Sequence, residues 1–299
     1  MAKNMKTQAE RLLVGRHLEL SSRHRAKARG DASSKIRSLS TFHRYRQALT
    51  LAGKWARVHH GIRRLDHLTR EMARAYLDQR RSSGIGQKQL HNDRIAMQFV
   101  TGKLPSVISL KEPPKEGRQY SRDEVERIVM RQSEPNRLAT RVAYDAGLRA
   151  HELLTLRRSD EDAPSSSRSW RSDRFLGRQG ARYVVTGKGG LVREVLLSSK
   201  LAENLEAHRL ENPRLVTDRG IHYRSHYMIG GGLAWSKSFS RGSQLEIGLS
   251  RGAHGLRHSY AHARFDELRA LGITEQKAKL ILSQELGHFR PQIVDTYLR

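Results

Sequence analysis

Apolar residues recur every three or four positions between residues 41 and 101, the spacing of one helix face. A first stretch begins after Thr41, a second opens at Thr69 and a third runs from Gln87 to Thr101. The apolar positions of the first two stretches are Phe42, Tyr45, Leu49, Ala52 and Trp55, and then Met72, Ala73, Tyr76 and Leu77. The pattern predicts a small unit built only from helices.

A different pattern follows in the second half of the chain. Ser121 and Glu124 have the spacing of a capping box, in which each side chain binds the other residue's backbone amide at a helix start. Two runs rich in Val and Leu, 182–186 and 191–197, flank a Gly-Lys-Gly-Gly turn at 187–190. This is the signature of a β-hairpin. The fold class we expect is mainly α with a small β-sheet.

The boundary between these parts is marked by Pro105, Pro113 and Pro114 among lysines, a composition typical of an extended linker. Residues 22–46 hold eight Lys or Arg and one Asp, with glycine and serines that interrupt any helical stripe. We therefore divide the chain into a basic N-terminal arm, a helical domain, a linker and an α+β domain, with the limits 1–40, 41–101, 102–118 and 119–299.

Charge suggests the partner. The 299 residues include 56 Lys and Arg against 30 Asp and Glu, a net charge of +26, which soluble proteins usually carry to meet a polyanion. A basic but non-binding protein stays open on composition alone. The basic side chains expected to lie on nucleic-acid phosphates are Arg23, Arg25, Lys27, Arg29, Lys35, Arg37, Arg44 and Arg46.

Several classes are excluded by what the chain lacks. There is no cysteine, so disulfide scaffolds, thiol catalysis and cysteine-ligated zinc do not apply. Residues 1–15 have no apolar core of a secretion signal, and no run of about 18 apolar residues could span a membrane. We expect a cytoplasmic protein of bacterial type, associated with the nucleoid and not with a membrane.

Four motifs occur in a fixed order along the second half. They are Gly-Leu-Arg-Ala-His-Glu at 147–152, Gly-Lys-Gly at 187–189, His-Gly-Leu-Arg-His at 254–258, and Leu-Gly-His at 286–288 with Tyr297 nine residues after His288. Together they resemble the tyrosine recombinase (phage integrase) family. The resemblance covers about 120–299 through these motifs and more loosely 41–101. It implies a helical core-binding domain, which binds DNA, followed by an α+β catalytic domain.

The resemblance implies six catalytic residues for attack on a DNA phosphodiester: Arg149, Lys188, His254, Arg257, His288 and Tyr297. The two guanidiniums would bind the scissile phosphate with paired donors. Lys188, at a hairpin tip, would give a proton to the leaving oxygen. Tyr297 would be the nucleophile and form a 3′-phosphotyrosine. A free phenol has a pKa near 10 and therefore needs surrounding cations to react.

Five residues have supporting or alternative interpretations. The imidazoles of His254 and His288 would hold or accept a proton near the phosphate and the phenol. Glu152 and His258 would steady the site without reacting. A zinc site on His254, His258 and His262, which are spaced by four, is the metal alternative. No acidic ligand accompanies these histidines, so we expect no metal and no cofactor.

The family also implies an assembly and leaves competitors. Its members act on double-stranded DNA with inverted half-sites, as a dimer on each site and a tetramer in the synapse, and some use accessory DNA-bending proteins. Integration, excision or transposition of a mobile element is the expected role. A type IB topoisomerase uses a similar residue set without strand exchange. A catalytically silent DNA-binding accessory protein would keep the fold alone. The intact residue set favours a recombinase.

Overall fold

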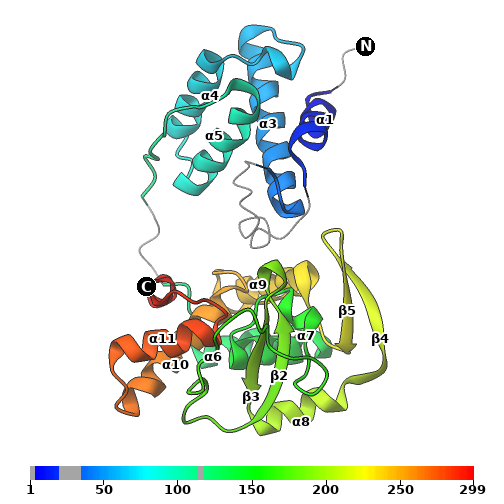
Figure 1. Cartoon of the computed structure of the whole chain (residues 1–299), viewed down its shortest axis with the longest axis vertical. Coiled ribbons are helices and arrows are strands. Elements are labelled where there is room, and N and C mark those ends of the chain that lie inside the picture. The colour runs from blue at the N-terminus through cyan, green and yellow to red at the C-terminus, as the bar shows by residue number, and fades with distance from the viewer. Residues whose placement is uncertain (1–3, 20–34, 113–116) are drawn as a thin grey trace. The chain divides into compact units, whose positions relative to one another are not determined.

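The computed structural model describes residues 4–19, 35–112 and 117–299. They form two compact units, Met1–Pro114 and Lys115–Arg299 (Figure 1). The helices of the first unit are α1 (Met5–His17), α3 (Leu39–His60), α4 (Arg70–Ser82) and α5 (Gln87–Thr101), with a 3-10 turn, η1 (Leu65–His67), between α3 and α4. None of the helices in the described residues combines the length and apolar character needed to span a membrane.

Helix α3 is the centre of the first unit, since it contacts α1, α4 and α5. It begins at the N-cap Ser38, whose side chain accepts from the amide of Thr41, and ends at Gly61 in the left-handed conformation. The predicted helical periodicity holds here, because Phe42, Leu49 and Ala52 of the expected stripe are buried in the core.

Helix α1 differs from the arm expected over residues 1–40. Met5, Ala9 and Leu13 are buried against α3, and Ile36 joins the same cluster. These helix positions are four residues apart and share one face, but basic neighbours obscure the stripe in the sequence. Residues 4–19 are thus part of the helical unit rather than a flexible arm.

The basic residues proposed to contact phosphate are placed differently from one another. Lys35 and Arg37 both pair with Glu19, at 2.6 and 3.1 Å, and the Arg37 side chain is only 6% exposed. Arg46 pairs with Glu10, and Arg44 binds backbone and hydroxyl oxygens within its own helix. Arg23, Arg25, Lys27 and Arg29 lie outside the described residues.

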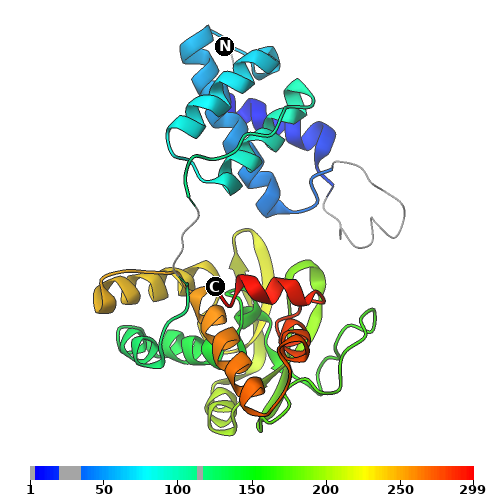
Figure 2. The same ribbon diagram turned by 90° about the vertical axis from the view of Figure 1, so that its left-hand side faces the viewer.

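The second unit begins with two helices that carry its core. Its helices are α6 (Arg122–Met130), α7 (Glu134–Ala146), α8 (Ser199–Ala207), α9 (Gly232–Ile247), α10 (Gly255–Ala270) and α11 (Glu275–Glu285), with 3-10 turns η2 (Glu152–Thr155), η3 (Lys188–Gly190) and η4 (Pro291–Thr296). The capping box predicted at Ser121 and Glu124 is present at the start of α6. Helix α7 contacts α6, α9, α10 and a strand, β3 (Val192–Leu197), and so joins the helices to the sheet (Figure 2).

Two small antiparallel sheets complete this unit. The first has the order β1 (Arg157–Arg158), β2 (Ala181–Thr186) and β3, with Val185 opposite Arg193. Strands β2 and β3 are the predicted hairpin. The second sheet pairs β4 (Arg209–Asp218) with β5 (Ile221–Tyr227) and was not predicted. The mainly α fold class with small sheets is confirmed.

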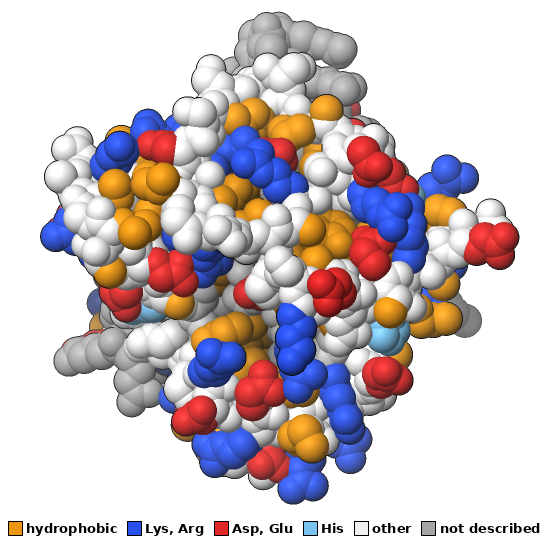
Figure 3. Space-filling model, turned by 90° about the horizontal axis from the view of Figure 1, so that it is seen from below, with side chains coloured by type: hydrophobic (Ala, Val, Ile, Leu, Met, Phe, Trp, Pro, Cys, Tyr) orange, Lys and Arg blue, Asp and Glu red, His pale blue; other side chains and the backbone are white. Residues whose placement is uncertain are grey.

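The face seen in Figure 3 carries Lys and Arg side chains interspersed with Asp and Glu. Many cations of the second unit form ion pairs with acidic side chains. Examples are Arg178 with Glu267 at 2.7 Å and Arg174 with Glu194 at 2.7 Å. The excess positive charge of the chain therefore does not gather on this face.

Candidate active site

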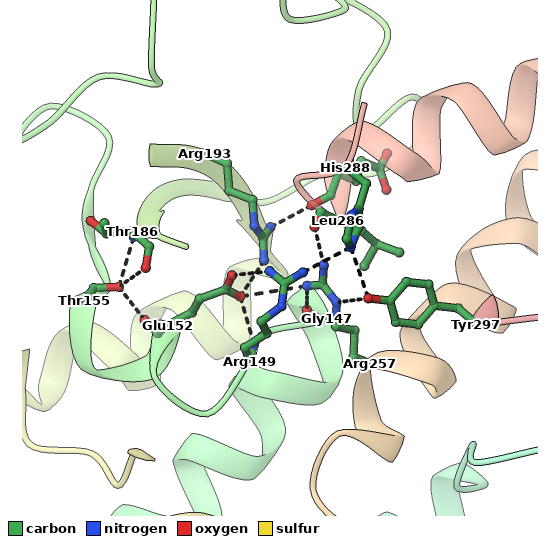
Figure 4. Close-up of polar contacts among 11 residues, drawn as sticks. Gly147, Arg149, Glu152, Thr155, Thr186, Arg193, Arg257, Leu286, His288 and Tyr297 are labelled. Atoms are coloured by element: carbon green, nitrogen blue, oxygen red, sulfur yellow. Dashed lines mark hydrogen bonds and ion pairs between the residues drawn. The ribbon is translucent and has the colours of Figure 1, made fainter. Parts of the chain in front are cut away.

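The predicted site residues come from five separate segments of the second unit. Arg149 lies in the turn between α7 and η2, Lys188 in η3 at the tip of the β2–β3 hairpin, and Arg257 in the first turn of α10. His288 follows α11, and Tyr297 directly follows η4. Figure 4 shows Arg149 and Arg257 between the Glu152 carboxylate on one side and His288 and Tyr297 on the other.

Gly147 makes the turn that presents Arg149. It caps α7 in the left-handed conformation, φ 60°, and a Cβ there would lie 2.7 Å from the ring of Tyr260. Glycine is thus needed both for the backbone angle and for the close approach of α10. The carbonyl of Gly147 also accepts a hydrogen bond from Arg257, so the same turn anchors both predicted arginines.

Glu152 is the buried centre of the site, with no exposed surface. It accepts from the backbone amide of Arg149 at 2.8 Å, from the Arg149 guanidinium at 2.7 Å and from Arg193 at 2.9 Å, and lies 3.8 Å from Arg257. Burial alone would raise the pKa of this carboxyl, but the guanidiniums of Arg193, Arg257 and Arg149 outweigh it and hold the pKa well below its usual range. Glu152 is therefore a carboxylate at any working pH.

Arg257 is fully buried and uses all its donor groups. It donates to the carbonyls of Gly147 and Leu286, and its Nε donates to the phenol oxygen of Tyr297 at 3.2 Å. Burial and the neighbouring charge of Arg149 lower its pKa to about 10, which still leaves the group cationic at neutral pH. A fixed positive charge therefore faces the oxygen of Tyr297.

Tyr297 is surrounded by imidazoles. Its side chain is 6% exposed, and its phenol oxygen lies 3.2 Å from His288 Nε2. His258 contacts the backbone carbonyl of Tyr297 through Nδ1 at 3.2 Å. The exposed His254 contributes a ring whose centre lies 5.9 Å from that of Tyr297, and the two side chains share no hydrogen bond. The structure thus gives His288 and His258 direct contacts and His254 a more distant place.

His288 presents a lone pair to the phenol. Its Nε2 lies 3.1 Å from Arg149 Nη2, and a guanidinium can only donate, so this nitrogen accepts. Burial first, and then the charges of Arg257 and Arg149, lower the pKa of the imidazole to about 3. His288 is therefore neutral near pH 7, and its Nε2 is a hydrogen-bond acceptor 3.2 Å from the phenol oxygen.

The neutrality of His288 gives a measurable expectation. Its imidazole should show no protonation step between about pH 5 and 8, because the adjacent guanidiniums disfavour a second positive charge. NMR of the ring protons against pH, with the His288 signal assigned by its loss in His288→Asn, measures this. An inflection of that signal near pH 6.5 would contradict the geometry.

A cavity of about 190 Å³ opens beside these groups. Lys188 is exposed on one wall of it, and Arg149 and His288 lie on others. Its lining residues are Arg149, Glu152, Gly187, Lys188, Leu191, Arg193, Gly287 and His288. The cavity therefore brings the hairpin lysine to the same space as the Arg149 guanidinium.

Arg193 is the site residue that the sequence motifs missed. It lies on β3, its side chain is 1% exposed, and it binds Glu152. Three guanidiniums, Arg149, Arg193 and Arg257, thus surround one carboxylate, so these four groups carry an excess of two positive charges. An inward position on a predicted strand, five residues after the hairpin lysine, was the signal that could have found it.

The chain is similar to one family model and to several solved structures. Residues 32–101 match the family model described as the phage integrase N-terminal SAM-like domain. The fold resembles three solved structures: lambda integrase (residues 75–356; TM-score 0.58, 16% identity, 93% of this chain and 95% of that chain), the site-specific recombinase XerH (0.55, 15%, 100% and 94%), and the Tn1549 transposon integrase (0.54, 13%, 97% and 94%). A search of curated proteins found no match.

The fold is that of the tyrosine recombinases, in both the helical and the catalytic parts. The predicted resemblance to the tyrosine recombinase (phage integrase) family is confirmed, by a domain of the first unit and by this fold.

Proposed function

We propose that this chain is a site-specific DNA recombinase that cuts and rejoins DNA strands through Tyr297. The observation that carries the proposal is the position of the Tyr297 phenol oxygen, 3.2 Å from both Arg257 Nε and His288 Nε2. One neighbour can stabilise a phenolate and the other can receive its proton. A tyrosine that only packs in a core needs neither.

The reaction can be written with each group in one role. The phenol oxygen attacks the scissile phosphorus while its proton passes to His288, whose basicity rises once the negative phosphate offsets the charges of Arg257 and Arg149, and the bond from phosphorus to the 5′ oxygen breaks. Lys188 gives that oxygen a proton, which leaves a 5′-hydroxyl and a 3′-phosphotyrosine. Arg149, which lines the cavity, binds a non-bridging oxygen as negative charge develops there, and the fixed charge of the buried Arg257 stabilises the same developing charge.

Strand exchange is the reverse step with another strand. The phosphotyrosine keeps the energy of the phosphodiester, so a 5′-hydroxyl from a second duplex can displace Tyr297 without ATP or a metal ion. The two positive charges in excess among Arg149, Arg193, Arg257 and Glu152 match the charge of a pentavalent phosphorane. They support catalysis at phosphate over mere binding.

The proposed substrate is double-stranded DNA. The net charge of +26 supports it, and the similar XerH and lambda integrase structures are described as bound to a difH substrate and, as a dimer, to a core site. We extend this to a dimer on inverted half-sites, a tetrameric synapse, and integration, excision or transposition of a mobile element. Arg44 and Arg46 remain candidates for phosphate contacts in the first unit.

The test is capture of the covalent intermediate. The purified chain is mixed with a pool of nicked duplexes of randomised sequence, in which cleavage releases a short strand and prevents religation. Covalent adducts are recovered, their DNA is sequenced to give the site, and the protein is digested for mass spectrometry. We expect the nucleotide on the C-terminal peptide, at Tyr297. A nucleotide on another residue, or no adduct, would refute the proposal.

The same selected site separates exchange from simple relaxation. Two duplexes that both carry the site are expected to yield recombinant strands, whereas a duplex with a scrambled site should yield none. Relaxation of any supercoiled plasmid without recombinants would instead indicate a topoisomerase.

A further inference from the structure

Arg193 connects three parts of the second unit that carry groups of the proposed reaction: strand β3, the Arg149–Glu152 turn and the end of α11. Its Nη2 donates to Glu152 at 2.9 Å and its Nη1 to the carbonyl of Glu285 at 2.6 Å. Glu285 is the last residue of α11, and His288 follows three residues later. One buried guanidinium therefore ties strand β3 to the Arg149–Glu152 turn and to the segment that holds His288.

The hairpin that carries Lys188 rests on this connection. Arg193 lies opposite Val185 in the β2–β3 register, next to the turn of Lys188. Gly187, which precedes the lysine, packs on Glu152: a Cβ at this glycine would lie 3.1 Å from the Glu152 carboxylate. Thr155 of η2 also binds the backbone of Thr186. The base of the hairpin is thus fixed to the η2 turn from both strands.

The close packing around Arg193 leaves it little freedom. A Cβ on Gly287, which has φ 69°, would lie 2.8 Å from Arg193 Cδ. Its Nε is buried and has no hydrogen-bond partner in the described part of the chain. Burying a cation whose Nε has no partner costs free energy of folding. A role in positioning the site would explain why an arginine stands at this place.

We infer that Arg193 is a positioning residue that fixes the Lys188 hairpin on Glu152 and so sets the reach of the lysine to the leaving oxygen. This inference rests on the proposed recombinase function. Arg193 itself does not touch the nucleophile: Arg257 and His288 fill that place. Its loss should therefore impair proton donation to the leaving group more than attack by Tyr297.

A sulfur substitution in the DNA separates these effects. When sulfur replaces the 5′ bridging oxygen, the leaving thiolate needs little help from a general acid, because thiols are far more acidic than alcohols. Arg193→Gln is expected to slow cleavage of the oxygen substrate by up to about 100-fold, the loss that a misplacement of about 1 Å in a reacting group can cause. On the sulfur substrate the loss should be at least about threefold smaller.

Three further variants complete the experiment. Gly287→Ala should show the same oxygen-to-sulfur difference, because the added methyl displaces Arg193 without removing charge. Arg193→Lys keeps a cation beside Glu152 and should restore part of the rate; it serves for the comparison if the Gln variant does not fold. Arg182→Gln is the control, on the same hairpin with a side chain 52% exposed, and should match wild type on both substrates.

The outcomes are distinguishable. Equal losses on the oxygen and sulfur substrates, or a folded Arg193→Gln protein with the wild-type rate, would overturn the inference alone. No adduct from the wild-type protein on either substrate would overturn the recombinase proposal and this inference with it.

Discussion

Tyr297→Phe is expected to abolish the covalent DNA adduct, with cleavage reduced on the order of 10⁴-fold or more, as when a nucleophile is removed from a catalytic set. The substitution deletes one oxygen. Arg257 and His288 keep their other partners, the carbonyls of Gly147 and Leu286 and the guanidinium of Arg149. The fold and DNA binding should therefore persist. Gel separation of adducts on the selected nicked site, beside a mobility-shift assay, measures both.

The control for this variant is Tyr223→Phe. Tyr223 lies on β5, which pairs with β4, and none of the hydrogen bonds and ion pairs described around Glu152 involves it. It should form the wild-type amount of adduct. An adduct that survives in Tyr297→Phe would show that another group attacks the phosphate, and the assignment of Tyr297 would be wrong.

The site was largely predictable because its parts are local motifs. Gly147 is typical of a helix end, and Glu152 follows Arg149 within one turn. Residues 147–152 therefore specify the contact between Arg149 and Glu152 locally. Lys188 is predictable from the glycines around it, which require a turn. The motifs do not show which of them lie side by side in the folded chain. Only the resemblance to a family indicated that the four motifs form one site.

Arg193 could not be read from the sequence in this way. It is one of 56 basic residues, and a buried cation differs from an exposed one only through partners far along the chain, here Glu152 and Glu285. Lys35 and Arg37 are similar cases, because their ion pairs with Glu19 also join residues far apart in the sequence; their predicted phosphate contacts stay a prediction. Charge counts predict the class of partner but not which side chains meet it.

Two elements were hidden by composition. Helix α1 has a narrow stripe of Met5, Ala9 and Leu13 among polar residues, too weak to identify without its partner α3. Strand β4 contains Pro213, which lacks an amide donor, within a register shift between Arg209 and Arg214. Its partner β5 follows after only Arg219 and Gly220, so the hairpin is local, but the proline and the polar residues of β4 hide the alternation that would predict a strand.

The charge balance at the centre of the site leads to the second large effect. Glu152→Gln should destabilise the protein by about 3–5 kcal/mol at neutral pH, the usual cost of removing one partner from a buried ionic cluster. The amide cannot neutralise Arg149, Arg193 and Arg257, and its own NH₂ would face their donors. Urea unfolding at pH 7 measures the change. Glu126→Gln is the control: its pair with Arg141 is about half exposed on both sides, so the change should stay below about 1 kcal/mol.

The pH dependence of the Glu152→Gln difference gives the sharper test. The three guanidiniums hold the pKa of Glu152 below its usual range, whereas an unfolded glutamate titrates near 4.3. A carboxylate with a lowered folded pKa stabilises the protein fully above the unfolded pKa and loses that contribution as pH falls toward the folded one. The stability gap between wild type and Glu152→Gln should therefore be constant from pH 6 to 8 and shrink progressively below about pH 4.3. A stability gap that widens on acidification would mean that burial, and not the three arginines, sets the pKa of Glu152. The proposal that Glu152 holds a cationic site for phosphate would then be wrong.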